Sequence, residues 1–502
     1  MSSNLFHALV PSDATQRRRP LLRRPGGQTL SYGDVDDRSA SVAGALVDAG
    51  VEVGDRVVVQ VDKSTDAVAL YLACLRRGAV FLPLNTAYTP AEVGFFVEDA
   101  SPALVVTRPG SRTDLGPDVA VVELGVDGGG SFAEAIDAAQ PIHDVVERAD
   151  DDLAAMLYTS GTTGRSKGAM LTHANLRSNG EALREVWGFV ADDVLLHTLP
   201  IFHVHGLFVA LHCAMLARAE VIFLDRFDVG AVVEHLPGST VMMGVPTHYA
   251  RLLDHDAFSA ATCSTVRLLT SGSAPMTAAT HRRVAERIGH EIVERYGMTE
   301  AGIITSNPDD GERVPGTVGF ALPGVELRVA DDDGVVVPTG ETGVVEIRSP
   351  GLFAGYWDLP DKTAAEHREG GWFVTGDVGS VDAEGRLTLE GRSGDMIISG
   401  GLNVYPKEVE MVLDAVAGVD ESAVVGVDHP DLGEAVLAIV VADGTVAASD
   451  LEDAMAASLD GVLARFKHPR AYVVVDELPR NAMSKVRKSE LRTRHAAHFS
   501  TR

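Results

Sequence analysis

The stretch RVVVQVDKSTDAVALYLACLRRGAVFLPL, residues 56–84, decides the fold class. It begins and ends with short runs rich in β-branched and other apolar residues, RVVVQV at 56–61 and GAVFLPL at 78–84, and a longer segment typical of a helix separates them. Short apolar strands that alternate with helices are typical of α/β folds built on parallel sheets. The stretch therefore predicts a strand–helix–strand unit.

The same alternation continues along most of the chain. Further short apolar runs, again separated by helical segments, lie at residues 103–107, 119–124, 220–224, 240–245 and 266–272. One helix start is marked by Thr89 before Pro90, with Glu92 close behind, which is the pattern of an N-cap followed by a first-turn proline. We therefore expect a large α/β body with parallel-type sheets, built from several subdomains.

The pattern changes after about residue 316. Residues 324–349, GVELRVADDDGVVVPTGETGVVEIRS, indicate strands joined by turns, with a hairpin signal at DDDG, and predict a β-rich portion. After GRSGD at 391–395 the chain favours a compact α+β tail that includes the helix start YPKEVEMVLDAV. We expect a large N-terminal domain over 1–394 and a small C-terminal domain over 395–502, a size that can support its own core.

Composition narrows the classes of function. The formal net charge of −28 argues against a nucleic-acid-binding protein, because such binding needs clustered cations. Cys74, Cys213 and Cys263 are widely spaced, so neither a disulfide framework nor a zinc site is indicated. We see no signal-peptide pattern and no apolar run of about 18 residues, the length that a membrane-spanning helix needs. We expect a cytoplasmic protein that binds neither nucleic acid nor membranes.

Residues 158–170, YTSGTTGRSKGAM, carry a strong chemical signal. Lys167 is followed by Gly168, so the G-x-x-x-x-G-K-[ST] pattern of a P-loop is not matched. The glycines allow backbone N–H groups to turn inward as an anion-binding nest, and the serine and threonine hydroxyls add donors. The loop therefore predicts a polyphosphate site, with a flexible surface turn as the alternative.

Other motifs follow the loop in a fixed order: LPIFHVHGLF (199–208), SGSAP (271–275), ERYGMTEAG (294–302), GGWFVTGDVG (370–379), GRSGDMIISGGLNVYPKEVE (391–410) and LPRNAMSK (478–485). In this order they resemble the core motifs of the adenylate-forming family, which contains acyl-CoA synthetases, nonribosomal adenylation domains and luciferases. The resemblance spans nearly the whole chain. It implies a mobile C-terminal lid domain and a reaction in which ATP and a carboxylic acid form an acyl-adenylate.

The resemblance implies a site for ATP and Mg²⁺. The β- and γ-phosphates would contact Thr159, Ser160, Gly161, Thr162, Thr163, Gly164 and Lys167. The adenine and ribose would contact Ser271, Gly272, Ser273, Ala274, Tyr296, Gly297, Asp377 and Arg392. Thr299 would contact phosphate oxygens and Glu300 would bind Mg²⁺, a cation that commonly takes one or two carboxylates besides phosphate oxygens.

The resemblance also assigns roles in the C-terminal domain. Lys485 would neutralise the charge that develops as the acid attacks the α-phosphorus, with a solvated basic tail as the alternative. Asp395 would be the hinge for rotation of the lid before the thiol of CoA reacts. The family usually has glycine where Ser484 stands and lysine where Gly394 stands. The residues implied for CoA binding, against the alternative of a solvated patch, are Gly401, Arg465, Lys467 and Arg470.

Polar residues in the expected acyl pocket favour a dicarboxylic acid. The candidates for this pocket are His203, His205, Arg251, Arg282 and Met298. A buried arginine requires a partner, and a carboxylate matches its forked guanidinium. The segments LPIFHVHGLFV, MGVPTHYARLL and SGSAP resemble the malonyl-CoA synthetase branch, in which the arginine after VPT-x-Y, here Arg251, binds the distal carboxylate. We expect malonate, with methylmalonate as a second substrate.

Two alternatives remain open at this point. One is a CoA ligase for another short or medium carboxylic acid, and the other is an adenylation enzyme that loads a carrier protein.

Overall fold

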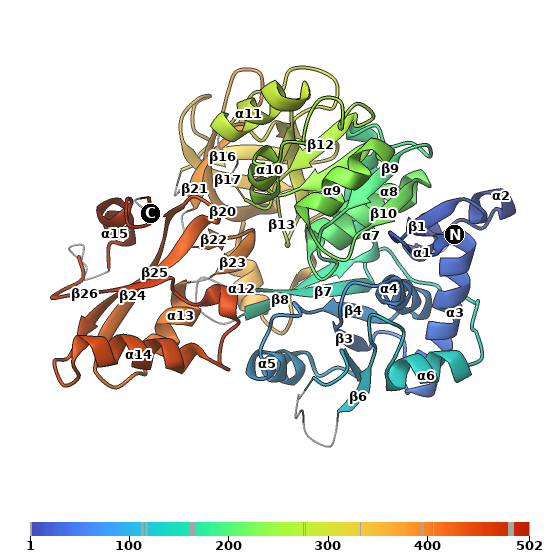
Figure 1. Ribbon diagram of the computed structural model, residues 1–502, viewed down its shortest axis with the longest axis horizontal. Helices are drawn as coiled ribbons and strands as arrows, with labels where there is room; N and C mark the ends of the chain where they lie inside the picture. The colour runs from blue at the N-terminus through green and yellow to red at the C-terminus, as the bar shows by residue number, and fades with distance from the viewer. Residues whose placement is uncertain are drawn as a thin grey trace. The chain divides into compact units, whose positions relative to one another are not determined.

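The computed structural model describes residues 3–111, 115, 119–160, 166–274, 276, 278–331, 333–392, 396–404, 406–479 and 486–500. The chain divides into two units (Figure 1). The first comprises Met1–Thr86, Val97–Leu157 and Gly168–Glu390, and the second comprises Ala87–Phe96, Tyr158–Lys167 and Gly391–Arg502. Within the described ranges, no helix has both the length and the apolar character needed to cross a membrane.

The first unit contains the strand–helix–strand unit expected from residues 56–84. Strands β3 (Arg56–Gln60) and β4 (Val80–Pro83) pair in parallel, and α4 (Thr65–Arg77) connects them. The Ser64 hydroxyl caps the start of α4 by accepting the Ala67 N–H at 3.1 Å. Gly78 ends the helix with a φ of 69°, a left-handed conformation that favours glycine. Local sequence signals thus set both helix boundaries.

These strands belong to a sheet whose order is β18-β8-β7-β4-β3-β5-β6. Its other strands are β18 (Gly355–Tyr356), β8 (Ser166–Thr172), β7 (Leu153–Ser160), β5 (Leu104–Thr107) and β6 (Ala120–Glu123). β4 with β7, β3 with β5 and β5 with β6 pair in parallel. Among the remaining helices of the N-terminal half are α1 (Phe6–Leu9), α2 (Ala14–Arg17), α3 (Tyr32–Asp48) and α6 (Ser131–Ala138).

A second sheet of the first unit carries several of the motif residues. Its order is β15-β14-β13-β12-β11-β9-β10-β1-β2. The strands are β15 (Phe320–Ala321), β14 (Gly302–Ser306), β13 (Val293–Met298), β12 (Leu268–Ser271), β11 (Val241–Gly244), β9 (Val194–His197), β10 (Glu220–Phe223), β1 (Pro20–Arg23) and β2 (Thr29–Ser31). The central pairings, from β13 to β1, are parallel. The α/β prediction is confirmed.

Apolar residues on both faces of this sheet are buried. Alternate residues such as Leu196, Met242 and Leu269 pack in one core with Tyr249 and Val284 from the covering helices, whereas their strand neighbours join the larger core of the unit. The helices of this region include α7 (His173–Val186), the π-helix η1 (His205–Leu211), α8 (His212–Ala217), α9 (Val229–His235), η2 (Leu236–Gly238), α10 (Pro246–Leu253) and α11 (Ala278–Ile288) (Figure 1).

The predicted β-rich portion is also present. Strands β16 (Glu326–Ala330), β17 (Gly343–Arg348), β20 (Trp372–Val381) and β19 (His367–Arg368) form an antiparallel sheet, β21 (Leu387–Arg392) pairs with β20, and α12 (Pro360–Ala365) precedes β19. The Glu346 carboxylate is fully buried in this sheet. It lies 2.7 Å from Nη2 of Arg328 and 2.7 Å from Nε of Arg368.

The second unit has the expected α+β character. Its sheet has the order β23-β22-β25-β24, and β26 pairs with β25. The elements are β22 (Ile397–Ser399), β23 (Leu402–Val404), α13 (Pro406–Leu413), β24 (Val419–His429), β25 (Gly433–Ala442), α14 (Ala448–Leu459), η3 (Arg465–Lys467), β26 (Ala471–Val475) and α15 (Lys488–His495). The start of α5 (Pro90–Ala100) also belongs to this unit, and Thr89 exchanges hydrogen bonds with Glu92 as predicted.

We predict that Glu346→Gln lowers the free energy of unfolding of the first unit by about 3 kcal/mol, because two guanidinium groups lose a buried carboxylate. The measurement is urea unfolding followed by circular dichroism. The matched control is Glu326→Gln in the adjacent strand, whose carboxylate is 60% exposed and pairs with Arg348. This surface pair is expected to contribute less than about 1 kcal/mol. Equal losses in the two variants would contradict the prediction.

Candidate active site

Thr299 and Glu300 lie in the turn of the β13–β14 hairpin, in the first unit. The Glu300 carbonyl accepts the Phe353 N–H at 2.7 Å, and its carboxylate Oε1 lies 3.0 Å from the Tyr356 hydroxyl. Glu300 is 7% exposed. The hairpin therefore holds one carboxylate in a nearly buried position directly after the strand that carries the ERYGM motif.

The residues expected to bind adenosine come together at one edge of the same sheet. Ser271 ends β12 and Tyr296 lies in the neighbouring parallel strand β13. The Tyr296 hydroxyl donates to Asp377 Oδ2 at 2.5 Å, and both side chains are buried. Ligands of α/β sheets commonly bind at the carboxyl ends of parallel strands. The structure thus places Tyr296, Asp377 and the Ser271–Ala274 segment where one ligand can contact them.

Two glycines at this edge make close approaches, and the one at Gly297 is to backbone. A Cβ at Gly272 would overlap the guanidinium of Arg295, and a Cβ at Gly297 would overlap the Gly302 carbonyl. Ser273 takes a left-handed φ of 67°, which is unusual for a residue with a side chain. The loop after β12 therefore lies in direct contact with a side chain of β13, and β13 itself approaches β14 closely at Gly297.

His203 and His205 lie beside this loop. The His205 Nδ1 atom is 3.3 Å from the Ser273 hydroxyl, and the His205 N–H donates to His203 Nδ1 at 3.3 Å. Burial, together with the nearby charge of Arg295, lowers the pKa of His203 to about 4. The same causes lower the pKa of His205 well below its usual value. Both imidazoles are therefore neutral at pH 7.

Arg295 supplies the positive charge at this place. Its side chain is 5% exposed, and burial lowers the pKa of the guanidinium to about 10, so it stays charged at neutral pH. Its Nε and Nη2 atoms are buried and have no hydrogen-bond partner among the described residues. A buried cation with unsatisfied donors is costly, since the lost hydration is not fully replaced. An anionic ligand at this place would stabilise the charge.

Other buried polar atoms also lack hydrogen-bond partners within the described ranges. Among them are Thr270 Oγ1 and Ser271 Oγ at the end of β12, His205 Nε2 and His248 Nδ1. A polar ligand can complete the hydrogen bonding of such groups. Of these residues, His205 lies beside the Ser273 hydroxyl in the loop after β12.

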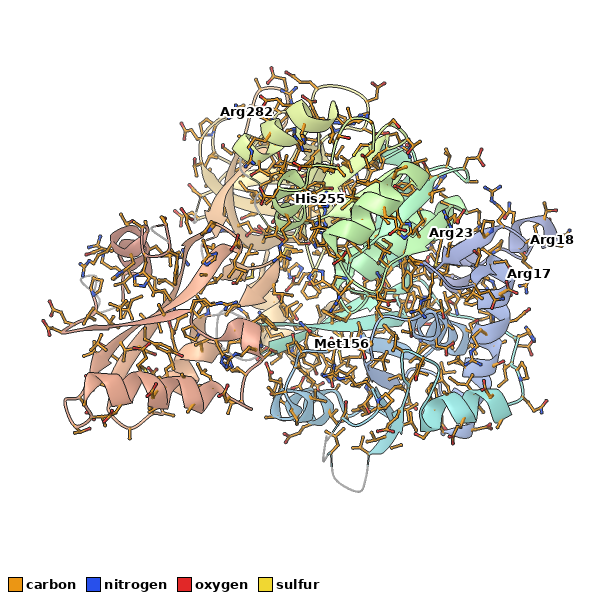
Figure 2. All side chains as sticks on the ribbon, in the orientation of Figure 1. Arg17, Arg18, Arg23, Met156, His255 and Arg282 are labelled. Carbon is orange, nitrogen blue, oxygen red and sulfur yellow. The ribbon has the colours of Figure 1, made fainter. Side chains whose placement is uncertain are left out.

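The two arginines expected from the sequence differ from Arg295 in exposure. Arg251 on α10 and Arg282 on α11 are both exposed, and Figure 2 marks Arg282 on its helix. Met298, at the end of β13, is half-buried. Sequence reasoning missed Arg295, although it lies inside the ERYGMTEAG motif. A charged residue within a strand of a buried parallel sheet is the signal that could have identified it.

Some of the expected site residues lie outside the described residues, namely Gly161, Thr162, Thr163, Gly164, Asp395 and Lys485. Two residues of the glycine-rich segment lie in strands. Thr159 lies in β7, and Lys167, which is 7% exposed, lies in β8. Ser160 and Arg392 end strands β7 and β21, and their side chains are not described.

The residues expected to bind CoA differ in exposure within the second unit. Arg465 and Arg470 are exposed, and Gly401 takes a φ of 81° in the turn between β22 and β23. Lys467 is buried and its ammonium lies 2.7 Å from Glu92 and 2.9 Å from Glu408. Burial lowers the pKa of Lys467, but the two carboxylates and Tyr88 raise it above its usual value overall. A phosphate contact by Lys467 would require both ion pairs to open.

Comparison with known proteins identifies the family. The chain matches the model of the AMP-binding enzyme family over residues 11–357 and that of the AMP-binding enzyme C-terminal domain over 408–485. It is 35% identical to a feruloyl-CoA synthase from Amycolatopsis sp over 477 residues, which cover 94% of this chain and 95% of the relative.

Two solved structures show the same fold over nearly the whole chain. ATP-bound MatB from Rhodopseudomonas palustris is 46% identical with a TM-score of 0.78, and the match covers 99% of this chain and 100% of that one. A malonyl-CoA ligase, solved as a ternary product complex with methylmalonyl-CoA and AMP, is 34% identical with a TM-score of 0.81, and the match covers 95% and 100%. The chain therefore belongs to the AMP-binding enzyme family and is an AMP-forming acyl-CoA ligase that resembles malonyl-CoA synthetases.

Proposed function

We propose that this ligase converts malonate, ATP and CoA into malonyl-CoA, AMP and pyrophosphate, with methylmalonate as a second substrate. A carboxylate oxygen of the acid attacks the α-phosphorus of ATP, and the bond to pyrophosphate breaks. The thiol of CoA, after loss of its proton, then attacks the acyl carbonyl, and AMP leaves. ATP and CoA are the usual substrates of AMP-forming CoA ligases, so the proposal concerns the acid.

The observation that carries the proposal is the buried guanidinium of Arg295, whose Nε and Nη2 atoms have no hydrogen-bond partner among the described residues. A second carboxylate on the substrate would supply two parallel hydrogen bonds to this group. Arg295 packs against Gly272, which we propose to line the adenine, so an acid held by Arg295 stays close to the nucleotide. This short reach suits malonate and excludes a long-chain acid.

The similar proteins point to two different classes of acid substrate. The malonyl-CoA ligase complex contains methylmalonyl-CoA and AMP, which supports a C3 diacid or its C2-methyl form. The feruloyl-CoA synthase, at about the same identity, supports an aryl acid. An aryl ring would desolvate Arg295 without pairing its charge. The charge at residue 295 therefore favours the diacid.

The same residues suggest how ATP is held. Tyr296 and Asp377 would contact the adenosine, since a carboxylate can accept hydrogen bonds from both ribose hydroxyls. Thr299 would donate to phosphate. Glu300 offers a single carboxylate, which fits Mg²⁺ because that cation takes most of its ligands from phosphates and water. When bound, Mg²⁺ would neutralise part of the triphosphate charge.

Lys485 remains the proposed catalytic cation. The charge that develops on the attacking oxygens and the α-phosphate favours a positive group placed there in advance. The proposal also keeps three expectations from the sequence. The glycine-rich loop binds the phosphates of ATP, and Asp395 is the hinge between domains over 1–394 and 395–502. Arg465 and Arg470 contact CoA. We also infer a cytoplasmic location, which the three buried, free cysteines support.

We predict that malonate supports CoA-dependent AMP formation at least about 100-fold better, in kcat/KM, than acetate, butyrate, benzoate or ferulate. An unpaired buried guanidinium would disfavour acids without a second carboxylate by a few kcal/mol. The measurement is a coupled AMP assay over this panel. Equal or better use of ferulate or butyrate would show that the substrate is not a diacid.

We predict that Arg295→Ala lowers kcat/KM for malonate by about 100-fold or more while the weak activity with butyrate does not fall, since only the diacid loses an ion pair. The matched controls are Arg251→Ala and Arg282→Ala, which remove exposed arginines. Selective loss of malonate use in either control, with normal malonate use in Arg295→Ala, would show that the distal carboxylate does not bind Arg295.

We predict that Lys485→Ala lowers malonate-dependent ATP–pyrophosphate exchange by about 100-fold or more, whereas thioester formation from supplied malonyl-adenylate persists. Lys488→Ala is the control, because Lys488 is a nearby lysine that forms an ion pair with Glu410 at 2.6 Å. Normal ATP–pyrophosphate exchange in the Lys485 variant would show that Lys485 does not act in the adenylation step.

A further inference from the structure

The Tyr356 hydroxyl lies between two carboxylates. It is 3.0 Å from Glu300 Oε1 and 2.7 Å from Glu366 Oε2. Tyr356 ends β18 and is 4% exposed, and Glu366 directly follows α12. Glu300 is the proposed ligand of Mg²⁺, so this contact determines the orientation of a carboxylate with a function in the reaction.

The arrangement places two carboxylates at one hydroxyl. A phenol carries one proton and donates to one carboxylate at a time, and positive charge nearby reduces the repulsion between the two carboxylates. Lys362 provides such a charge for Glu366, with 2.9 Å between Nζ and Oε1. A divalent cation bound by Glu300 would add positive charge beside the other carboxylate.

The backbone around Tyr356 is fixed from two sides. Phe353 N–H donates to the Glu300 carbonyl at 2.7 Å, which joins this segment to the hairpin turn. β18 pairs with β8, the strand that follows the glycine-rich loop in the sequence, with Tyr356 opposite Ala169. The Tyr356 ring also packs edge-on against Phe353, with 4.8 Å between centroids. The hydroxyl is therefore held by elements that do not depend on it.

We propose that Tyr356 is a positioning residue that, together with Glu366, orients the Glu300 carboxylate for the divalent cation. The inference rests on the metal role proposed for Glu300 and is independent of which acid the enzyme uses. Hydrogen-bonding partners of metal ligands typically contribute about 10–100-fold to metal affinity, because they fix the ligand in its binding orientation.

The test uses Mn²⁺ as the probe, titrated into the full-length enzyme saturated with ATP and followed by electron paramagnetic resonance. Tyr356→Phe, which keeps the ring contacts, is expected to weaken Mn²⁺ binding by about 10–100-fold. ATP affinity measured in excess chelator is expected to stay unchanged. Glu366→Gln is expected to weaken Mn²⁺ binding in the same direction.

Two further variants distinguish failure of the positioning role of Tyr356 from failure of the metal role of Glu300. Tyr32→Phe is the matched control, because its buried hydroxyl lies 3.2 Å and 3.0 Å from the carbonyl oxygens of Ala214 and Ala219, and the variant should bind Mn²⁺ like the wild type. Glu300→Gln should lose Mn²⁺ affinity. Wild-type affinity in Tyr356→Phe with loss in Glu300→Gln would overturn the positioning role alone. Wild-type affinity in Glu300→Gln would overturn the metal role and this inference together.

Discussion

The parallel pairing of β12 with β13 is the constraint on which the rest of the site depends. Hydrogen bonding between Ser271 and Glu294 fixes the register, so the loop after β12 begins beside the residues that continue β13. Side chains alternate along a strand, and successive residues therefore face opposite ways. Arg295 and Tyr296 are such neighbours, and β13 then leads into the turn with Glu300. This strand and the turn after it thus carry the groups that we propose for the acid, the nucleotide and the metal.

The charge of Arg295 illustrates how a site proposed for a ligand can reduce the stability of the free protein. A guanidinium that is almost fully buried has lost its hydration, and in the described part of the chain two of its nitrogens gain no hydrogen bonds in return. By contrast, the buried carboxylate of Glu346 lies beside two arginines, which supply its counter-charge. Among the described residues the two buried charges differ in whether the protein itself supplies a counter-ion, and this difference is the reason that we propose a ligand for the first and a structural ion pair for the second.

The sequence predicted the fold from local patterns, whereas the burial of individual site candidates depends on tertiary packing. Alternation of strands and helices, the cap at Thr89 and the turn-rich region after 316 are local properties, and the structure contains all of them. Exposure is different, because it depends on which helix face packs against the sheet. The sequence therefore could not show that Arg251 is exposed or that Lys467 is held between two carboxylates. Arg295 was overlooked because its burial follows from long-range strand pairing.

The contact between Gly272 and the guanidinium of Arg295 has an evolutionary consequence. A Cβ at position 272 would meet the guanidinium, which is the far end of a flexible side chain, so a larger residue at 272 requires that group to shift. Loss of the arginine would remove this contact and leave space against a bare backbone. We therefore expect substitutions at positions 272 and 295 to be coupled, with residues larger than glycine at 272 accepted more readily once the arginine is replaced.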